Sequence, residues 1–467
     1  MRILFATSEA IPYFKTGGLG DVSRALPDAL VAAGHEVRIL LPLYGGVRER
    51  ADRLETVLET TLPWPIAPVD VRFHLHRPPS GAPAVLVDQP AFFEPGTPYG
   101  GDSGDPLETG RRFALFSRAI ARFAREWEPD VVQLNDWTTG LMPIYSMLDG
   151  TDVPTVFAVH NLGYHGNYWP ALLRQVGIPE SFFRTENGLE FHHNASFMKA
   201  ALALADRIVT VSPTYAREIQ TPEYGNGFDG LLRFRHRVLH GILNGLNAAV
   251  WDPAHDPHLR HRYTAATLDG KDGNRSVLLD VCGFADDAPV FAMISRLVQQ
   301  KGIDLVLRAM PALLDAGIRL VILGDGDRGF EWEVEQVARS SGGRVAAFLR
   351  FDDALAHRIY AGADFFLMPS RYEPCGLGQM IAQRYGTPPV ARRTGGLADT
   401  ITDRKTGFLF DEPAPEALID AVHRAVAAWR AKGWNALRRR CMRLDHTWDT
   451  AAADYERVYR LATGALG

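Results

Sequence analysis

The sequence has few cysteines, no long apolar run and almost no excess of charge of either sign. Its three cysteines, Cys282, Cys375 and Cys441, form no CxxC pair, which argues against a disulfide framework or a zinc site. No stretch of about 18 or more apolar residues is present, so we expect no membrane span. The first residues, MRILFATSEA, lack the apolar region and cleavage site of a signal peptide. We therefore expect a cytoplasmic protein.

The charge balance also excludes a class of partner. The chain has 50 Lys and Arg against 55 Asp and Glu, which gives a formal net charge of −5. Such a chain has no global electrostatic signature of nucleic-acid binding, so an anionic ligand would be held by a few placed cations. Of the 467 residues, 46% are hydrophobic and 22% charged, which excludes a disordered, collagen-like or coiled-coil chain. The length predicts two large domains or about three smaller ones.

Short apolar runs alternate with amphipathic stretches, which predicts βαβ units and parallel sheets. A strand at 2–7 leads through a glycine-rich turn to a helix at about 21–33, and the periodicity is lost around 243–251. We expect the chain to cross into a second domain there, because a second alternating series follows. Further strands are expected at 36–42, 131–134, 155–160, 207–212, 289–295, 319–324, 344–351, 364–369 and 389–391, and a last helix at 448–462.

The glycine-rich turn KTGGLGD, residues 15–21, is the first segment with a chemical pattern. Gly17 and Gly18 let backbone N–H groups approach a ligand at a helix N-terminus, and Lys15 adds a positive charge. The segment matches neither GxGxxG nor GxxxxGK[ST], so neither NAD binding nor ATP hydrolysis follows. It suits a phosphate or a sugar oxyanion. TGGLAD at 394–399 is similar, although glycine pairs are common in such turns.

Two segments of the second series follow predicted strands and precede helices. SRLVQQKGID, residues 295–304, places Arg296 and Lys301 beside a helix start, where two cations suit a diphosphate; two solvated charges are the alternative. In SRYEPCGLGQ, residues 370–379, Glu373 can accept sugar hydroxyls or, alternatively, cap the next helix. No motif supplies a base that would activate Cys375, so we interpret this residue as a wall of the site.

His160 and Asn161 directly follow the predicted strand TVFAV. Open α/β sheets place ligands at the carboxyl ends of their strands. A lone histidine is more often structural than catalytic, so this position indicates function only together with the other segments.

Together these segments resemble the bacterial glycogen synthase and plant starch synthase family. The matching stretches are KTGGLGDV at Lys15, NDW at Asn135, HNLGYHG at His160, SPTYAREI at Ser212, ILNGLN at Ile242, SRLVQQKG at Ser295, SRYEPCGLGQ at Ser370 and RRTGGLADT at Arg392. The resemblance implies an α/β fold of two Rossmann-like, doubly wound domains that face each other across a cleft (GT-B). Residues 1–245, joined by a C-terminal helix at 448–467 that crosses back, would form the acceptor side, and residues 246–447 the nucleotide-sugar donor side.

The same resemblance implies retaining transfer of glucose from ADP-glucose to the nonreducing end of an α-1,4-glucan. The expected substrates are thus a nucleotide sugar and an α-glucan, with no metal or other cofactor, because cations would stabilise the departing diphosphate. Phe351 would offer an aromatic face to the adenine. The implied catalytic residues are Glu373, His160, Arg296 and Lys301; the donor would be bound by Lys15, Gly17, Gly18, Asn244, Phe351, Cys375, Gly376, Leu377, Gly395 and Gly396; and Glu9 and Asp136 would line the acceptor side.

The sequence departs from the family pattern at several positions. Thr138 stands in place of a usual histidine, His165 of a glutamine, His193 of a glycine and Gly378 of a threonine, and Phe351 lacks the hydroxyl of the usual tyrosine. The acceptor is therefore less well defined than the chemistry. UDP-glucose or a short acceptor is one alternative, and a weakly active glucan-binding protein is another. No segment resembles the pyridoxal phosphate site of glycogen phosphorylase.

Overall fold

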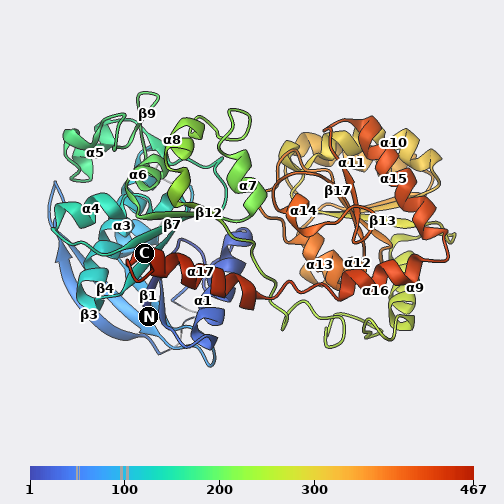
Figure 1. Ribbon diagram of the computed structural model, residues 1–467, viewed down its shortest axis with the longest axis horizontal. Helices are drawn as coiled ribbons and strands as arrows, with labels where there is room; N and C mark the ends of the chain where they lie inside the picture. Colours follow the sequence, from blue (N-terminus) through green and yellow to red (C-terminus); the bar gives the residue numbers. More distant parts are fainter. Residues whose placement is uncertain (49–50, 52, 95–97, 101–104, 467) are drawn as a thin grey trace. The chain divides into compact units, whose positions relative to one another are not determined.

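The computed structural model describes residues 1–48, 51, 53–94, 98–100 and 105–466. The chain forms two compact units (Figure 1). Unit 1 consists of Met1–Gly245 and Trp448–Gly467, and unit 2 of Leu246–Thr447. Among the residues described, none of the helices combines the length and the apolar character that a membrane crossing requires.

Unit 1 is built on a nine-stranded sheet with the order β12-β11-β7-β6-β1-β2-β5-β4-β3. The strands from β12 to β5 are parallel, and β4 and β3 add an antiparallel edge. These strands are β1 (Arg2–Ala6), β2 (Glu36–Pro42), β3 (Glu55–Leu62), β4 (Val69–His76), β5 (Ala84–Asp88), β6 (Val131–Asn135), β7 (Thr155–Val159), β11 (Arg207–Thr210) and β12 (Leu239–Gly241). A small antiparallel sheet has the order β8 (Asn167–Tyr168), β10 (Asn194–Ser196) and β9 (Glu190–Phe191). The strands β6 and β7 are buried at every residue, as is typical of parallel strands covered on both faces.

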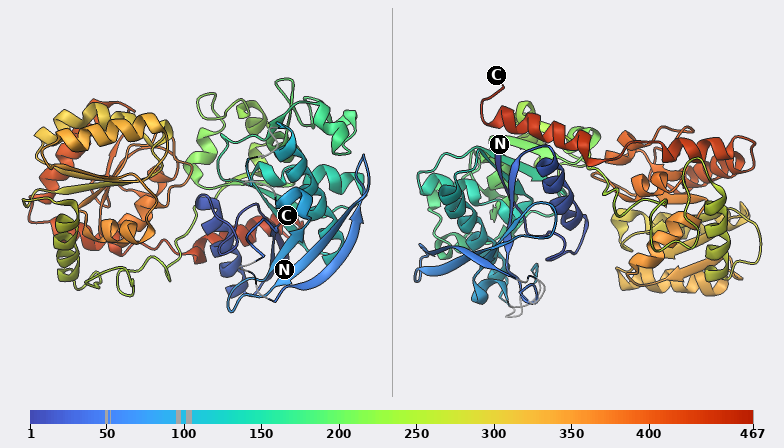
Figure 2. Two further views of the ribbon diagram at one scale, coloured as in Figure 1. Left: turned by 180° about the vertical axis from the view of Figure 1, so that it is seen from behind. Right: turned by 90° about the horizontal axis from the view of Figure 1, so that it is seen from below.

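The last helix, α17 (Trp448–Ala462), belongs to unit 1 although it follows unit 2 in the chain. It packs against α1 (Gly18–Ala32), β7 and β11 (Figure 2). Tyr455 and Tyr459 on its inner face are fully buried, and Arg207 of β11 donates a hydrogen bond of 2.9 Å to the Leu461 carbonyl. The predicted final helix is confirmed. The other helices of unit 1 are α2 (Pro90–Phe93), α3 (Glu108–Trp127), α4 (Met142–Leu148), α5 (Ala171–Gln175), α6 (Phe197–Leu204), α7 (Pro213–Glu218) and α8 (Asp229–Phe234).

Unit 2 contains a six-stranded parallel sheet with the order β15-β14-β13-β16-β17-β18. Its strands are β13 (Val290–Ile294), β14 (Arg319–Leu323), β15 (Val345–Phe348), β16 (Phe365–Met368), β17 (Pro389–Arg392) and β18 (Phe408–Phe410). The chain order reverses between β13 and β16, and such a switch point is where doubly wound sheets bind ligands. Its helices are α9 (Asp269–Cys282), α10 (Ile303–Asp315), α11 (Arg328–Ser340), α12 (Asp353–Gly362), α13 (Gly378–Arg384), α14 (Gly395–Thr400), α15 (Pro415–Trp429) and α16 (Trp434–Met442).

All of the predicted strands are present, with ends that differ by up to three residues. The strand predicted at 344–351, for example, is β15 and ends at Phe348. The helix predicted at about 21–33 begins earlier, at Gly18, because the extended residue Gly17 is its N-cap. The sequence patterns did not indicate β3, β4, β5, β12, β18 or the small sheet. All three cysteines are free thiols.

Candidate active site

In unit 2, the loops that follow the neighbouring strands β13 and β16 bring Lys301 and Glu373 together. Lys301 ends the short 3-10 helix η4 (Gln299–Lys301), and its Nζ lies 2.8 Å from Oε1 and 2.6 Å from Oε2 of Glu373. Ser370 donates a further hydrogen bond of 2.9 Å to Oε2. The side chains of Lys301 and Glu373 are only 19% and 6% exposed. The alternative role of Glu373 as a helix cap is wrong, because the N-cap of α13 is Leu377.

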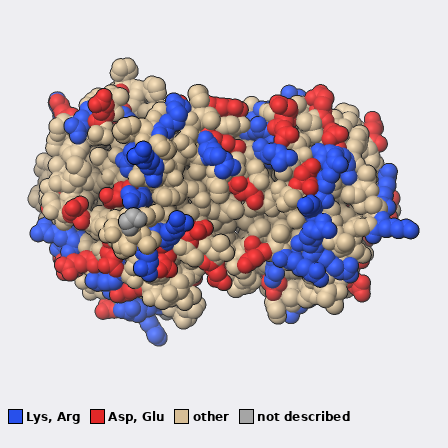
Figure 3. Space-filling view, viewed as in Figure 1, with Lys and Arg blue, Asp and Glu red and all other residues tan. Residues whose placement is uncertain are grey.

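Arg296, which follows β13, has a different environment from Lys301. Its side chain is exposed, and none of the ion pairs in the described part of the chain includes it. Basic and acidic side chains are interspersed over most of the face seen in Figure 3, although basic side chains gather at its lower right, near α16. An anion bound near β13 would therefore depend on individual cations such as Arg296, whose charge is not neutralised by a neighbouring carboxylate.

The glycines of unit 2 that were expected to bind the donor have a packing role of their own. A Cβ atom on Gly395, whose φ is +43°, would lie 1.9 Å from the Glu373 carbonyl oxygen, and one on Gly396 would lie 2.1 Å from the Cys375 carbonyl oxygen. The Gly396 N–H donates to the Glu373 carbonyl at 3.2 Å. The start of α14 thus packs directly on the backbone around Glu373 and positions it.

The remaining predicted residues of unit 2 lie around this loop or at the end of β15. Cys375 is 5% exposed, and Gly376 has a left-handed backbone with a φ of +73°. Phe351 lies between β15 and α12, and 78% of its surface is exposed. Its ring is therefore available to stack on a planar ligand.

In unit 1, Glu9 and the glycine-rich turn form one hydrogen-bonded cluster. The Thr16 N–H donates to Glu9 Oε2 at 2.6 Å, the Thr16 hydroxyl to Oε1 at 2.7 Å and the Gly17 N–H to Oε2 at 3.3 Å. Glu9 itself is 3% exposed. Of the donors expected to bind a ligand, the Gly17 N–H is thus engaged by Glu9, for which the resemblance implied an acceptor-side position. Lys15 pairs with Asp21 at 2.8 Å.

A chain of hydroxyl groups connects Thr138 to this cluster. Thr138 Oγ1 donates to Ser8 Oγ at 3.2 Å, Ser8 Oγ and the Tyr99 hydroxyl are 2.9 Å apart, and Tyr99 donates to Glu9 Oε1 at 2.5 Å. Thr138 is 1% exposed. No sequence motif indicated Ser8 or Tyr99; the position of Ser8 just after β1 was the only signal for either. Thr138, a departure from the family pattern, thus fits a continuous polar network.

His160 and Asp136 lie at the carboxyl ends of β7 and β6 and hold each other in place. Asp136 Oδ1 accepts the His160 backbone N–H at 2.8 Å. His160 Nε2 lies 2.9 Å from Asn135 Oδ1, and the Asn135 amide donates to the Ala6 carbonyl at 2.8 Å. This pattern assigns the proton to Nε2 and leaves Nδ1 as an acceptor.

Burial shifts the pKa of both side chains toward the neutral form. It lowers the pKa of His160 to about 4. It raises the pKa of Asp136 to about 7, although the backbone N–H groups of His160 and Asn161 act in the opposite direction. At neutral pH, His160 is therefore an uncharged hydrogen-bond acceptor.

Asn244 follows β12 and has an unsatisfied polar atom. It is 7% exposed, and its Oδ1 is buried without a hydrogen-bond partner among the described residues. A buried acceptor without a donor costs free energy. A hydroxyl group from outside the chain is the kind of donor that would satisfy it.

The structure shows the surroundings of three of the departures from the family pattern. His193 has a positive φ of 65°, which is the conformation that glycine adopts most easily. A Cβ atom on Gly378 would lie 2.9 Å from Cε1 of Phe366, so a threonine there would collide with the ring. The ring of His165 packs edge-on against Phe191 and Phe228. It is therefore part of an aromatic cluster.

Comparisons with known proteins identify the family of the chain. Residues 2–234 match the model of the starch synthase catalytic domain, and residues 278–441 match that of the group 1 glycosyl transferases. The chain is 46% identical to a glycogen synthase of Anaeromyxobacter dehalogenans, over 98% of this chain and 99% of that protein. It is 43% identical to the glycogen synthase of Aromatoleum aromaticum, over 98% of this chain and 96% of that protein.

Solved structures match as well. The catalytic domain of starch synthase IV from Arabidopsis thaliana, bound to ADP and acarbose, has 31% identity, a TM-score of 0.89 and 99% coverage of both chains. Sucrose-phosphate synthase from Thermosynechococcus elongatus shares the fold at 20% identity, with a TM-score of 0.62 and 100% coverage of both chains. The predicted GT-B fold is confirmed. The chain belongs to the glycogen synthase family of glycosyltransferases.

Proposed function

We propose that the protein transfers glucose from ADP-glucose to the nonreducing end of an α-1,4-glucan, with retention at the anomeric carbon and without a metal ion. The related starch synthase IV was solved with ADP and acarbose, which supports adenine as the base of the nucleotide. The exposed ring of Phe351 offers a surface on which adenine can stack.

The pairing of Lys301 with Glu373 carries the proposal. When the bond between the glucose and the diphosphate breaks, negative charge develops on the leaving phosphate, and placed cations lower the energy of that state. Lys301 has three N–H donors, and Glu373 holds the ammonium at 2.6 and 2.8 Å. The ammonium is thus positioned before the nucleotide sugar binds, and it keeps one N–H group that can donate a hydrogen bond to a phosphate oxygen. The charge of Lys301 is neutralised by Glu373, so Arg296 supplies the positive charge that no carboxylate among the described residues neutralises.

Unit 1 supplies acceptors for the hydroxyl groups of the glucose. The unprotonated Nδ1 of His160 and the unpartnered Oδ1 of Asn244 can each accept a hydrogen bond from the sugar. Because His160 is neutral at neutral pH, it accepts such a bond without adding a charge. In this proposal Asp136, whose pKa is about 7, lies on the side where the glucan acceptor binds.

The test measures nucleotide release from ADP-glucose and from UDP-glucose, each with and without glycogen or maltooligosaccharides, in EDTA. We expect glucan-dependent release of ADP that EDTA leaves unchanged, and NMR of the first product should show an α-linkage. Release only from UDP-glucose would reassign the donor, and loss of activity in EDTA would refute the metal-free mechanism. No glucan-dependent release from either donor would favour a glucan-binding protein.

Two variants test the cations. Arg296→Ala and Lys301→Ala should each lower turnover about 100-fold to 1,000-fold, because each removes a charge that stabilises the transition state. Arg339→Ala is the control, since Arg339 forms an ordinary exposed pair with Glu335 on α11. Rates like that of the control in both variants would contradict the role given to the cations.

A further inference from the structure

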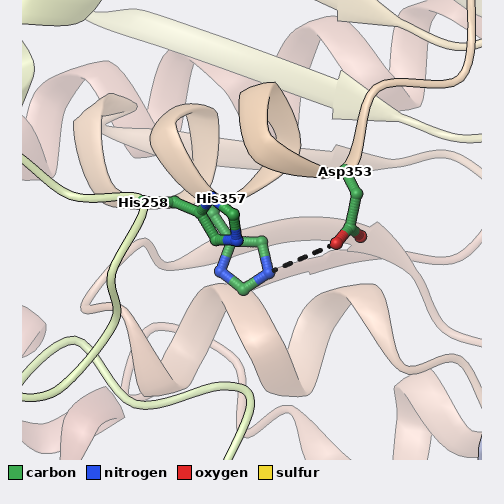
Figure 4. Close-up of side chains that lie close together, drawn as sticks. All are labelled: His258, Asp353 and His357. Carbon is green, nitrogen blue, oxygen red and sulfur yellow. Dashed lines mark ion pairs between the residues drawn. The ribbon is translucent and has the colours of Figure 1, made fainter.

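Outside the residues discussed so far, two histidines and an aspartate in unit 2 converge. His258, Asp353 and His357 each offer one ligand atom, and these atoms all lie within 4.8 Å of one another. Asp353 begins α12 and His357 lies one turn later, while His258 comes from the loop that precedes α9 (Figure 4). Residues four apart on a helix share a face, so α12 presents both of its side chains to the loop.

The orientation of His357 is fixed from behind by a buried carboxylate. Asp256, whose side chain is 0% exposed, accepts a hydrogen bond from His357 Nδ1 at 2.7 Å and one from the Tyr385 hydroxyl at 2.5 Å. The ring of Trp251 stacks on that of His357, with the ring centroids 4.0 Å apart and an angle of 11° between the ring planes. Nε2 of His357 therefore points toward Asp353. Histidines that bind metals typically donate their other N–H to a carboxylate in this way.

A simple ion pair explains this cluster less well. Nε2 of His357 lies 4.0 Å from Asp353 Oδ2, which is too long for a hydrogen bond. A second imidazole, His258, lies with its ring 4.7 Å from that of His357. His258 would add nothing to an ion pair between His357 and Asp353. A bound cation, in contrast, can take one nitrogen of each histidine and the carboxylate as ligands.

From this geometry we propose that His258, Asp353 and His357 bind a divalent transition-metal ion, with Zn²⁺ as the best fit. Two imidazoles and one carboxylate are a typical zinc ligand set, with solvent as the fourth ligand. Bonds of about 2.1 Å place tetrahedral ligand atoms about 3.4 Å apart, so the cluster must contract slightly. His357 is fixed, but the Asp353 side chain is 61% exposed and can move. The lack of a CxxC pair argues only against a zinc site with cysteine ligands, and none of these three ligands is a cysteine.

The bound ion would attach the loop containing Asp256 and His258 to α12. None of its ligands is a residue to which we assign a role in glucose transfer. We therefore expect the ion to stabilise unit 2 and to leave the metal-free turnover unchanged. This inference does not depend on the proposed function, since its readout is metal binding.

The test uses the full chain after removal of metals with EDTA and of the EDTA by dialysis. Titration with Co²⁺ should give one equivalent of a visible absorption band typical of fewer than six ligands, which Zn²⁺ displaces, and Zn²⁺ should raise the unfolding temperature. His258→Ala and Asp353→Asn should each weaken Zn²⁺ binding at least tenfold, measured by calorimetry. Both change side chains at or near the surface, so the buried His357 stays intact.

His255→Ala is the matched control, because the His255 side chain is 83% exposed in the same loop and pairs with Asp252. It should bind Zn²⁺ like the unaltered protein. Absence of stoichiometric binding to the unaltered chain would overturn the proposal. Unchanged binding in both His258→Ala and Asp353→Asn would also overturn it, since the ion would then lie elsewhere.

Discussion

Replacing Lys301 with methionine should separate the stabilising role of the Lys301–Glu373 pair from its catalytic role. The substitution keeps most of the side-chain volume but removes the ammonium that lies 2.6 and 2.8 Å from the carboxylate. Glu373, with only 6% of its side chain exposed, would keep the Ser370 hydroxyl as a donor and lose its counter-charge.

The magnitude follows from the burial of the pair. Removing one partner of a buried ion pair costs about 3–5 kcal/mol, because the other charge stays buried and unpaired. Lys301 is 19% exposed, so water reaches the site in part, and we expect a loss of about 2–3 kcal/mol for this pair. For a unit of roughly 200 residues this lowers the unfolding temperature by about 5–10 °C.

The assay combines calorimetry of the full chain with nucleotide release. Lys301→Met/Glu373→Gln removes both charges, so it should regain most of the lost stability while its turnover stays low. Lys405→Met, at an exposed lysine of the same unit, is the control. The reasoning is refuted if Lys301→Met unfolds at the same temperature as the control. It is also refuted if the stability lost in the double variant equals the sum of the losses in Lys301→Met and Glu373→Gln.

Three further predictions concern single positions. The folded state keeps a proton on Asp136, whose pKa is about 7, at pH values where the unfolded chain, with a pKa of 3.8, has released it. The contribution of Asp136 to stability should therefore fall as pH rises from about 4 to 7, while that of His160, whose pKa is lowered to about 4, rises. Thermal unfolding should show the stability of Asp136→Asn increasing relative to that of the unaltered protein across that window; a constant difference would contradict this. Gly378→Thr should cost about 1–3 kcal/mol through its collision with Phe366, and in urea unfolding Gly378→Thr/Phe366→Leu should recover part of that loss. His193→Gly should raise stability by about 0.5–1 kcal/mol in the same assay, because it relieves a φ of 65°, whereas a loss would show that the imidazole has a packing role.

The apolar pattern predicted most of the buried parallel strands but not where they end. The strand predicted at 207–212 ends at Thr210, because the Ser212 side chain accepts the Tyr215 N–H at 3.1 Å and caps α7. The strand β3 was not predicted, because half of its residues are exposed and it lies at the antiparallel edge of the sheet. A half-exposed edge strand lacks the continuous apolar run by which the parallel strands are recognised.

For the candidate site, the sequence indicated the residue types but not their partners. Arg296, Lys301 and Glu373 follow strands, and that much is visible in the chain. The contact between Lys301 and Glu373 depends on β13 and β16 being neighbours, which no local pattern encodes. The binding of Glu9 to the glycine-rich turn was likewise hidden, because it depends on how the chain folds back between the end of β1 and Thr16.

The position of α17 has a consequence for synthesis of the protein. Unit 1 receives its last helix only after all of unit 2 has been translated. At about 5–20 residues per second, the roughly 200 intervening residues take about 10–40 s. During that interval the faces of α1, β7 and β11 that later bury Tyr455 and Tyr459 are without their cover. The nascent chain therefore exposes an apolar surface that a chaperone can bind, and unit 2 can complete its fold before unit 1 does.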